Sequence, residues 1–175
     1  MSTILVEPLE KKHRKLFSDF RVTEEESDYF KKYLTRHALP DQEKGKARTY
    51  LCIERDSAGN DNLLGFYSLR ASSLIIEMDF EDKRKGEPAI ELYELAVNMT
   101  IQKRGIGKKL MHDAIATIYN TSQTVGVRYI LVCAKKDAVS YYKKFGFAQL
   151  PGYKDIPRSD DNSECVPMYI SLHKK

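Results

Sequence analysis

Apolar residues recur at helical spacing in several segments of the chain. Near the N-terminus, Tyr29, Phe30 and Tyr33 return at intervals of three and four after an acidic run, which is typical of a helix. Further along, an apolar stripe extends from Ile106 to Ile118. We therefore predict helices over residues 8–17, 23–37, 105–120 and 137–146, the last capped by Asp137 and stopped by Gly146.

Runs rich in β-branched and aromatic residues mark the strands. Two of them flank a turn at residues 57–62 and predict an antiparallel hairpin. One buried strand precedes the long helix and another follows it, an order that predicts a parallel pair joined by a right-handed crossover. The predicted strands cover residues 48–56, 63–74, 89–97, 127–134 and 164–172. The fold class is therefore α/β, with a mixed central sheet flanked by helices.

Length and composition narrow the class of protein. With 175 residues, 42% of them hydrophobic, the chain has the size of one domain, which we expect to cover residues 1–175. No apolar stretch approaches the roughly 18 residues of a membrane span, and no secretory signal begins the chain, so we expect a cytoplasmic protein without a membrane partner. The formal net charge of +4 is compatible with anionic ligands but does not by itself indicate nucleic acid.

The cysteines and histidines show no metal-ligand or disulfide pattern. Cys52, Cys133 and Cys165 are odd in number and widely spaced, so we expect reduced thiols. The four histidines are equally scattered, and we predict no metal site. Cys133 could be considered as a nucleophile, but no histidine accompanies it in a local motif.

The loop before the long helix breaks a rule of helix electrostatics. A helix N-terminus favours acidic side chains, yet this one carries Lys103, Arg104, Lys108 and Lys109. Glycines within the same stretch allow a backbone to approach an anion closely, so that several N–H groups converge on phosphate oxygens. The segment predicts a phosphate-binding loop, and the alternative is a solvated basic turn.

Spacing excludes two common phosphate loops. A Walker A loop needs glycine five residues before Gly107 and serine or threonine after Lys108, where Gln102 and Lys109 stand instead. A dinucleotide-binding loop needs a third glycine at the position of Leu110.

Two motifs resemble those of the GNAT acetyltransferases. Residues 102–107, Gln-Lys-Arg-Gly-Ile-Gly, resemble the loop that binds the CoA pyrophosphate in this family, and residues 138–147 resemble its second signature, an alanine followed by an aromatic pair and Gly-Phe. The resemblance covers about residues 91–150 and implies an acetyl-CoA-dependent N-acetyltransferase of the single-domain GNAT fold, in which the parallel strands splay apart.

The resemblance also implies which residues hold the co-substrate. Backbone groups of residues 95–97 would pair with the pantetheine arm, and N–H groups of residues 103–108 would hold the pyrophosphate. The implied acetyl-CoA-binding residues are Leu95, Ala96, Val97, Gln102, Lys103, Arg104, Gly105, Ile106, Gly107, Lys108, Lys135 and Tyr142.

Acetyl transfer to an amine needs a proton for the departing thiolate. Tyr142 suits this role, because a phenol with a pKa near 10 stays protonated at neutral pH, and the resemblance implies the same role. The alternative is that Tyr142 packs in the core with Phe145. For the general base the resemblance favours Glu91; Glu94, which lies on the opposite face of the same strand, and a water chain are the alternatives.

One subgroup of the family resembles this chain further. Lys135 stands where the family often has asparagine, and the pattern of residues 134–138 resembles the toxins that acetylate aminoacyl-tRNA. Lys135, Lys136, Lys143 and Lys144 are then candidates for an RNA-facing patch, with a solvated helix face as the alternative.

Three functional hypotheses follow. The first is acetyl transfer to a primary amine by direct attack in a ternary complex, the acceptor being a small molecule or a macromolecule. Its narrower form is a tRNA-acetylating toxin, for which tRNA would be the partner. The third is a non-catalytic CoA-binding or nucleic-acid-binding module. We also expect a homodimer, formed through an edge strand at residues 164–172.

Overall fold

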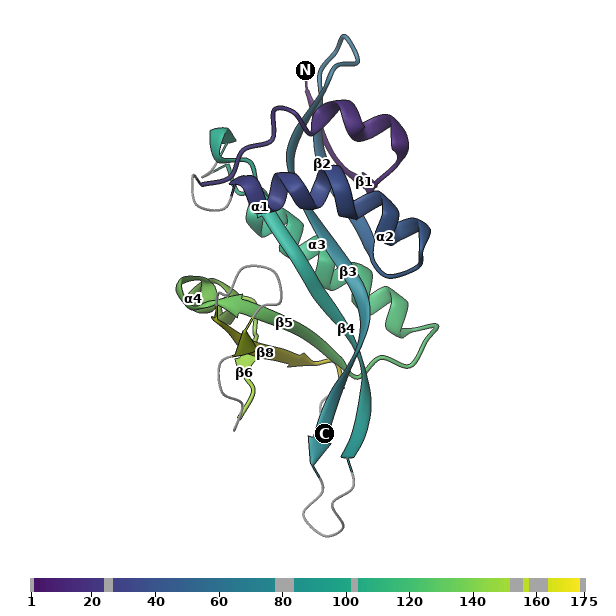
Figure 1. Cartoon of the computed structure of the whole chain (residues 1–175), viewed down its shortest axis with the longest axis vertical. Helices are drawn as coiled ribbons and strands as arrows, with labels where there is room; N and C mark the ends of the chain where they lie inside the picture. Colours follow the sequence, from purple (N-terminus) through teal and green to yellow (C-terminus); the bar gives the residue numbers. More distant parts are fainter. Residues whose placement is uncertain are drawn as a thin grey trace. The chain divides into compact units, whose positions relative to one another are not determined.

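The computed structural model describes residues 2–23, 27–77, 84–101, 104–151, 156–157 and 164–173 (Figure 1). Its strands pair in the order β1-β2-β3-β4-β5-β8-β6, with β7 also pairing with β8. They are β1 (Thr3–Pro8), β2 (Arg48–Arg55), β3 (Asp61–Glu77), β4 (Arg84–Val97), β5 (Tyr129–Lys135), β6 (Ala148–Gln149), β7 (Ile156–Pro157) and β8 (Glu164–Ser171). The α-helices are α1 (Ser27–Lys32), α2 (Leu39–Glu43), α3 (Ile106–Ser122) and α4 (Val139–Lys143).

The predicted sheet is confirmed in its main pairings. Strands β2 and β3 form the antiparallel hairpin, and β4 and β5 pair in parallel on either side of α3 in the chain. Strand β8 lies between β5 and β6, so residues 164–172 do not form the edge on which the homodimer prediction rested. The short strands β6 and β7, each two residues long, carry too little sequence pattern to be predicted.

The N-terminal part differs from the prediction. Residues 3–8 form strand β1, paired antiparallel with β2, and a 3₁₀ helix (Lys11–Leu16) replaces the predicted helix over residues 8–17. The second predicted helix is continuous to Glu43, but its middle is a π-helix (Tyr33–Ala38). Pro40 explains the widened turns, because its ring would meet the carbonyl of Arg36 in a regular α-helix.

The other helices agree with the prediction more closely. Helix α3 begins at Ile106 and ends at Ser122, near the expected bounds. Asp137 does not cap the last helix, since it lies within a 3₁₀ turn (Lys136–Ala138) that precedes α4. Gly146 follows with a φ of 91°, a left-handed conformation that suits glycine after a helix end. No helix of the described ranges is long and apolar enough to cross a membrane.

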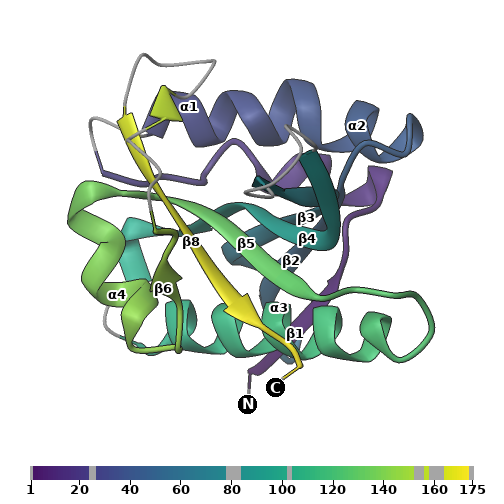
Figure 2. The same ribbon diagram turned by 90° about the horizontal axis from the view of Figure 1, so that it is seen from below.

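The chain divides into two compact units, of which the first comprises residues 1–70 and 94–114. In this unit α1 and α2 cover one face of the strands and the first turns of α3 cover the other (Figure 2). Phe66 is fully buried, stacks on Tyr33 at 5.9 Å and meets Phe20 edge-on at 5.6 Å. Because a buried aromatic ring removes much apolar surface from water, truncating Phe66 to alanine would cost about 3–5 kcal/mol.

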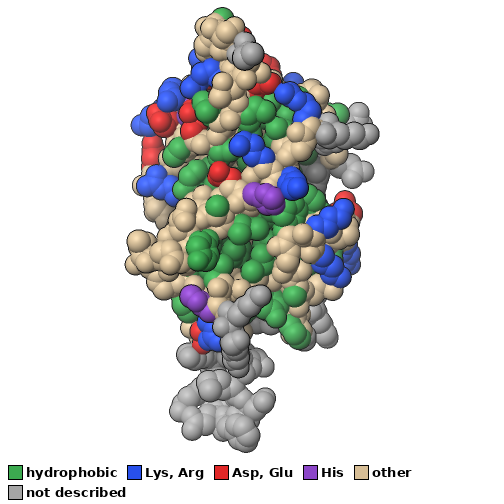
Figure 3. Space-filling model, turned by 180° about the vertical axis from the view of Figure 1, so that it is seen from behind, with side chains coloured by type: hydrophobic (Ala, Val, Ile, Leu, Met, Phe, Trp, Pro, Cys, Tyr) green, Lys and Arg blue, Asp and Glu red, His purple; other side chains and the backbone are tan. Residues whose placement is uncertain are grey.

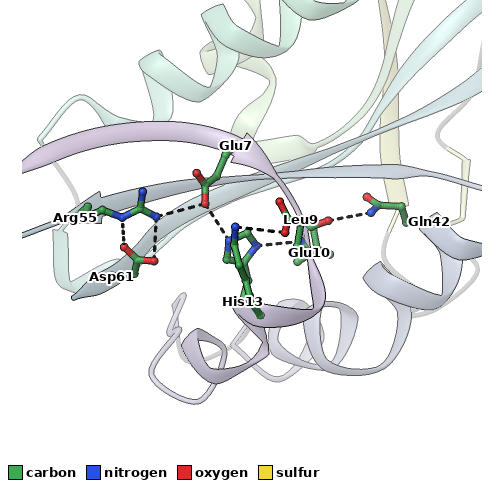
Figure 4. A network of polar contacts seen from close by, with 8 residues as sticks. Glu7, Leu9, Glu10, His13, Gln42, Arg55 and Asp61 are labelled. Carbon is green, nitrogen blue, oxygen red and sulfur yellow. Dashed lines mark hydrogen bonds and ion pairs between the residues drawn. The ribbon is translucent and has the colours of Figure 1, made fainter. Parts of the chain in front are cut away.

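A polar network attaches β1 to the hairpin within this first unit (Figure 4). His13 is buried and its Nε2 lies 2.9 Å from Glu7, while the backbone N–H of Glu10 donates to Nδ1 at 3.0 Å. Because Nδ1 accepts that bond, the proton of a neutral ring stands on Nε2 and is donated to Glu7. Arg55 approaches Glu7 at 3.6 Å and binds Asp61 through two nitrogens. The network therefore fixes where the N-terminal strand lies.

The second unit comprises residues 71–93 and 115–175. Within it Arg128 binds Glu87 at 2.9 Å, and its backbone N–H donates to the carbonyl of Pro88. A disulfide joins Cys133 of β5 to Cys165 of β8, whose Cα atoms are 5.4 Å apart. The prediction of reduced thiols is therefore wrong for these two cysteines, because antiparallel pairing brings together residues 32 positions apart. Cys52 is free and buried.

Candidate functional site

The parallel pairing of β4 and β5 is short. Its register joins Ala89 to Tyr129 and ends where Glu91 meets Leu131, although β4 runs on to Val97 and β5 to Lys135. The backbone groups of residues 95–97, predicted to hold the pantetheine arm, belong to the part of β4 that lies beyond this register.

The end of β4 is fixed against β3. Asn98 is buried, its backbone N–H donates to the carbonyl of Leu64 at 2.8 Å, and its side-chain nitrogen donates to Leu63 at 3.1 Å. Gly65 lies so close that a Cβ there would stand 2.7 Å from the carbonyl oxygen of Ala96, which requires glycine at this position. The sequence argument missed Asn98, whose only local signal is a polar residue directly after an apolar strand.

The predicted phosphate loop is described in part. A 3₁₀ turn (Met99–Ile101) starts it, Gln102 and Lys103 lie outside the described residues, and α3 begins at Ile106. Gly105 has a φ of 76°, in the left-handed region, and among the described residues, its two chain neighbours apart, no atom lies within 4 Å of where its Cβ would be. The backbone therefore turns tightly into the helix at a position where any side chain would be strained.

Arg104 does not project as a free cation. Its guanidinium binds both carboxylate oxygens of Glu54 on β2, at 3.0 and 3.3 Å, and Ser2 donates to the same carboxylate at 2.9 Å. The hydrogen bonds from Arg104 and Ser2 lower the pKa of Glu54, and the bond to Glu54 raises the pKa of Arg104. The exposed basic residues in the first turn of α3 are Lys108 and Lys109. Sequence reasoning missed Glu54, which precedes Arg104 by 50 positions.

Figure 3 shows one face of the molecule, and in its upper part basic and acidic side chains are interspersed. Lys136, Lys143 and Lys144 of the second unit are exposed, as the hypothesis of an RNA-facing patch requires, and Lys135 at the end of β5 is partly buried.

Tyr141 and Tyr142 occupy neighbouring positions of α4 in the second unit. The Tyr142 ring meets Phe147 edge-on at 5.6 Å, and the Tyr141 ring meets Phe145 at 5.0 Å. The hydroxyl of Tyr141 is buried and has no hydrogen-bond partner among the described residues, and burial raises the pKa of Tyr141 to about 12. The two phenols therefore have different environments, a difference that an aromatic pair in sequence does not reveal.

The two carboxylates considered for the general base are placed differently. Glu91 is partly buried in the second unit, where its Cα registers with Leu131. Glu94 is only 3% exposed in the first unit, and the hydroxyl of Tyr29 on α1 donates to it at 2.5 Å. The sequence argument missed Tyr29, which lies 65 positions from Glu94.

The disulfide rules out the alternative in which Cys133 acts as a nucleophile. Cys133 is bonded to Cys165 and offers no thiol for a covalent intermediate in this state.

Comparison with known proteins decides the family. The family model of the acetyltransferase (GNAT) domain matches residues 19–172. The chain belongs to the GNAT acetyltransferase family. This GNAT chain is 33% identical over 125 residues to a tRNA-acetylating toxin of Mycobacterium tuberculosis, a match that covers 68% of this chain and 72% of the toxin.

Solved structures of the same fold include toxins. A Tyr-to-Phe variant of the AtaT toxin, bound to the C-terminus of the antitoxin AtaR and to acetyl-CoA, matches with a TM-score of 0.70 and 23% identity, over 96% of this chain and 92% of that chain. AtaT complexed with acetyl-methionyl-tRNAfMet matches with a TM-score of 0.69 and 21% identity, over 94% of each chain. The predicted GNAT fold, the acetyltransferase class and acetyl-CoA as co-substrate are thus confirmed.

Proposed function

We propose that this GNAT acetyltransferase transfers the acetyl group of acetyl-CoA to the α-amino group of aminoacyl-tRNA. The observation that carries the proposal is the 33% identity to the tRNA-acetylating toxin of Mycobacterium tuberculosis over most of both chains. The exposed lysines of the 3₁₀ turn and α4 support it, because they supply positive charge beside the helix that carries Tyr142. Because aminoacyl-tRNA is a cytoplasmic acceptor, we propose that the enzyme acts in the cytoplasm.

The co-substrate would be held mainly by backbone groups. Residues 95–97 offer the backbone of β4 beyond its register with β5, which suits pairing with a pantetheine arm. The turn at Gly105 and the first N–H groups of α3 suit the pyrophosphate, with Lys108 adding charge. Gln102 and Lys103, which belong to the same proposed loop, lie outside the described residues. Arg104 would contribute its backbone, since its side chain binds Glu54.

The transfer would proceed by direct attack in a ternary complex. The amine lone pair attacks the acetyl carbonyl carbon, the new C–N bond forms, and the C–S bond breaks as the carbonyl is restored. Tyr142 donates its phenolic proton to the departing thiolate and recovers a proton from solvent. The carboxylates of Glu91 and Glu94 are the two candidates on β4 for receiving the proton of the acceptor amine.

Labelled acetyl-CoA tests the proposal. We expect the protein to transfer the label to a pool of charged tRNA and to leave the same pool unlabelled after its amino acids have been removed by hydrolysis. Labelling of small amines with no labelling of charged tRNA would contradict the proposed acceptor while leaving the acetyltransferase class intact. Binding of acetyl-CoA without transfer to any amine would favour the non-catalytic module.

Two partners belong to the same proposal. An antitoxin is proposed because the solved AtaT toxin is bound to one, and co-purification from the native host tests it. The homodimer stays a prediction, although β8 is not an edge strand and so does not support it. Light scattering of the purified protein tests the oligomeric state.

A further inference from the structure

Glu94 is an unusual carboxylate because it is buried on a strand. It lies in β4 with 3% of its surface exposed, on the same strand face as the buried Ala96. Burying a carboxylate costs free energy unless partners compensate for the lost water, and such groups concentrate at functional sites. A strand position that only packed against a helix would be served better by an apolar residue.

Two tyrosines of the helical segment that covers the sheet interact with Glu94. Tyr29 on α1 donates its hydroxyl to one carboxylate oxygen, and α1 covers this face of the strands (Figure 2). Tyr33, in the π-helical turn that follows, is the second titratable group described near it. Burial raises the pKa of Tyr33, and the negative charges of Glu94 and Asp41 add to the increase. The buried carboxylate thus interacts with both phenols, and burial leaves its charge weakly screened.

The place of Glu94 in the chain connects it with the proposed function. It directly precedes Leu95, the first residue of the strand end that would pair with the pantetheine arm. If the phosphates bind at the start of α3 and the arm pairs with residues 95–97, a carboxylate one residue before this strand end would lie toward the thioester end of the arm. Glu91, by contrast, lies where β4 is still in register with β5.

We propose that Glu94, held by Tyr29, is the carboxylate that receives the acceptor ammonium group and takes its proton. The inference rests on the proposed function and deepens it, because it names the group that the acceptor must present, a protonated primary amine. Glu94 is then a catalytic residue, and Tyr29 is a positioning residue that acts through it.

The proton balance of the step is complete. The ammonium group gives one proton to Glu94 and becomes a neutral nucleophile. Its lone pair forms the C–N bond, the C–S bond breaks, and Tyr142 protonates the thiolate. The nitrogen loses its second proton as the amide forms, which restores the phenol through solvent, and Glu94 releases the first proton to water.

Substitution of Glu94 at several pH values tests this role. With charged tRNA as the acceptor, Glu94→Gln should lower kcat/KM about 100-fold at pH near 6.5. The loss should shrink to about 10-fold at pH near 8.5, because an α-amino group with a pKa near 8 is then largely neutral without help. Glu94→Asp should recover part of the activity, since it keeps the carboxylate.

Two tyrosines of the same helical segment provide a test variant and its matched control. Tyr29→Phe removes the hydrogen bond to Glu94 and should lower kcat/KM about 10-fold, with the pH profile displaced relative to wild type. Tyr33→Phe removes a hydroxyl bound to Ser68 instead, and should stay within about twofold of wild type. Calorimetric titration with acetyl-CoA, expected to change less than about twofold in every variant, shows that each protein is folded.

The outcomes separate this inference from the proposed function. If wild type labels no charged tRNA, the proposed function fails and the inference with it. If wild type is active and Glu94→Gln matches it, or loses the same factor at every pH, Glu94 has no role in deprotonation and only the inference is overturned. A pH-dependent loss in Glu91→Gln without one in Glu94→Gln would assign the role to Glu91.

Discussion

The start of α3 and the start of α4 present different kinds of group to a ligand. The described features at α3 are the helix N-terminus and Gly105, which has a left-handed backbone conformation. The side chain of Arg104 is hydrogen-bonded to Glu54. At α4 the described features are two phenols in contact with phenylalanine rings, and the described residues offer the hydroxyl of Tyr141 no hydrogen-bond partner. The first region suits binding through the backbone and the second suits proton transfer through a side chain. Binding and chemistry should therefore respond to different substitutions.

The largest effect that sharpens this comparison concerns Tyr142. We expect Tyr142→Phe to lower kcat at least about 100-fold, because the thiolate then leaves without its proton donor. The affinity for acetyl-CoA should change less than about twofold, since the backbone at α3 is untouched. Steady-state kinetics together with calorimetry measure both. An unchanged kcat would leave Tyr142 a packing residue, which was the alternative interpretation.

The second effect concerns the disulfide, whose two cysteines lie on either side of α4 in the chain. Reduction should lower the free energy of unfolding by about 2–4 kcal/mol, since the bond closes a long loop. Urea unfolding with and without a reductant measures the difference, and titration with acetyl-CoA in reductant should give an unchanged affinity. The double variant Cys133→Ala with Cys165→Ala is the control, because reductant should have no effect on its stability. If the urea midpoint of wild type is the same with and without reductant, the assignment of the disulfide is contradicted.

The third effect concerns Tyr141, the neighbour of the proposed acid. Tyr141→Phe should keep full activity and stabilise the fold by up to about 1 kcal/mol, because it removes a buried hydroxyl to which none of the residues that the structure describes is hydrogen-bonded.

Alkaline pH gives a second test of Tyr141. The pKa of Tyr141 is raised from about 10 to about 12, so the folded state binds more protons than the unfolded state between these values. Stability present below pH of about 10 is therefore lost as the pH rises through about 12, and Tyr141→Phe should lose less. Urea midpoints at several alkaline pH values would show it. Equal losses in both proteins would contradict the assigned environment.

The smallest effect concerns Glu54. Glu54→Gln frees Arg104 and removes a negative charge close to the proposed phosphate site, so the Kd for acetyl-CoA should fall by up to about threefold at low salt. The difference should vanish at roughly 1 M salt, where exposed charges are screened. A Kd that rises more than about tenfold would show instead that the ion pair holds the loop in its binding shape.

Local patterns predicted the features that are local in the chain. The glycine turn before α3, the amphipathic stripe of α3 and the aromatic pair of α4 each occupy a few adjacent residues, and a single periodicity or motif describes them. The strand-helix-strand order also predicted the parallel pair, because connection rules restrict the topology.

Contacts between residues far apart in the sequence could not be predicted from local patterns. The partner of Arg104 is 50 residues away, the partner of Glu94 is 65 residues away, and the disulfide spans 32 positions. Each of these contacts depends on strand register or on how a helix lies over the sheet. The local sequence pattern predicts neither the register nor the position of the helix. Strand β1 was missed because its six residues carry mixed polarity at an edge, where alternation is weak.

The separation of binding from chemistry is tested most directly by calorimetric titration with acetyl-CoA of wild type, Gly107→Glu and Tyr142→Phe. We predict micromolar binding by wild type and Tyr142→Phe, and a loss of at least about 100-fold in Gly107→Glu, whose carboxylate would repel the pyrophosphate at the start of α3. Undiminished binding by Gly107→Glu, or lost binding in a folded Tyr142→Phe, would contradict the account.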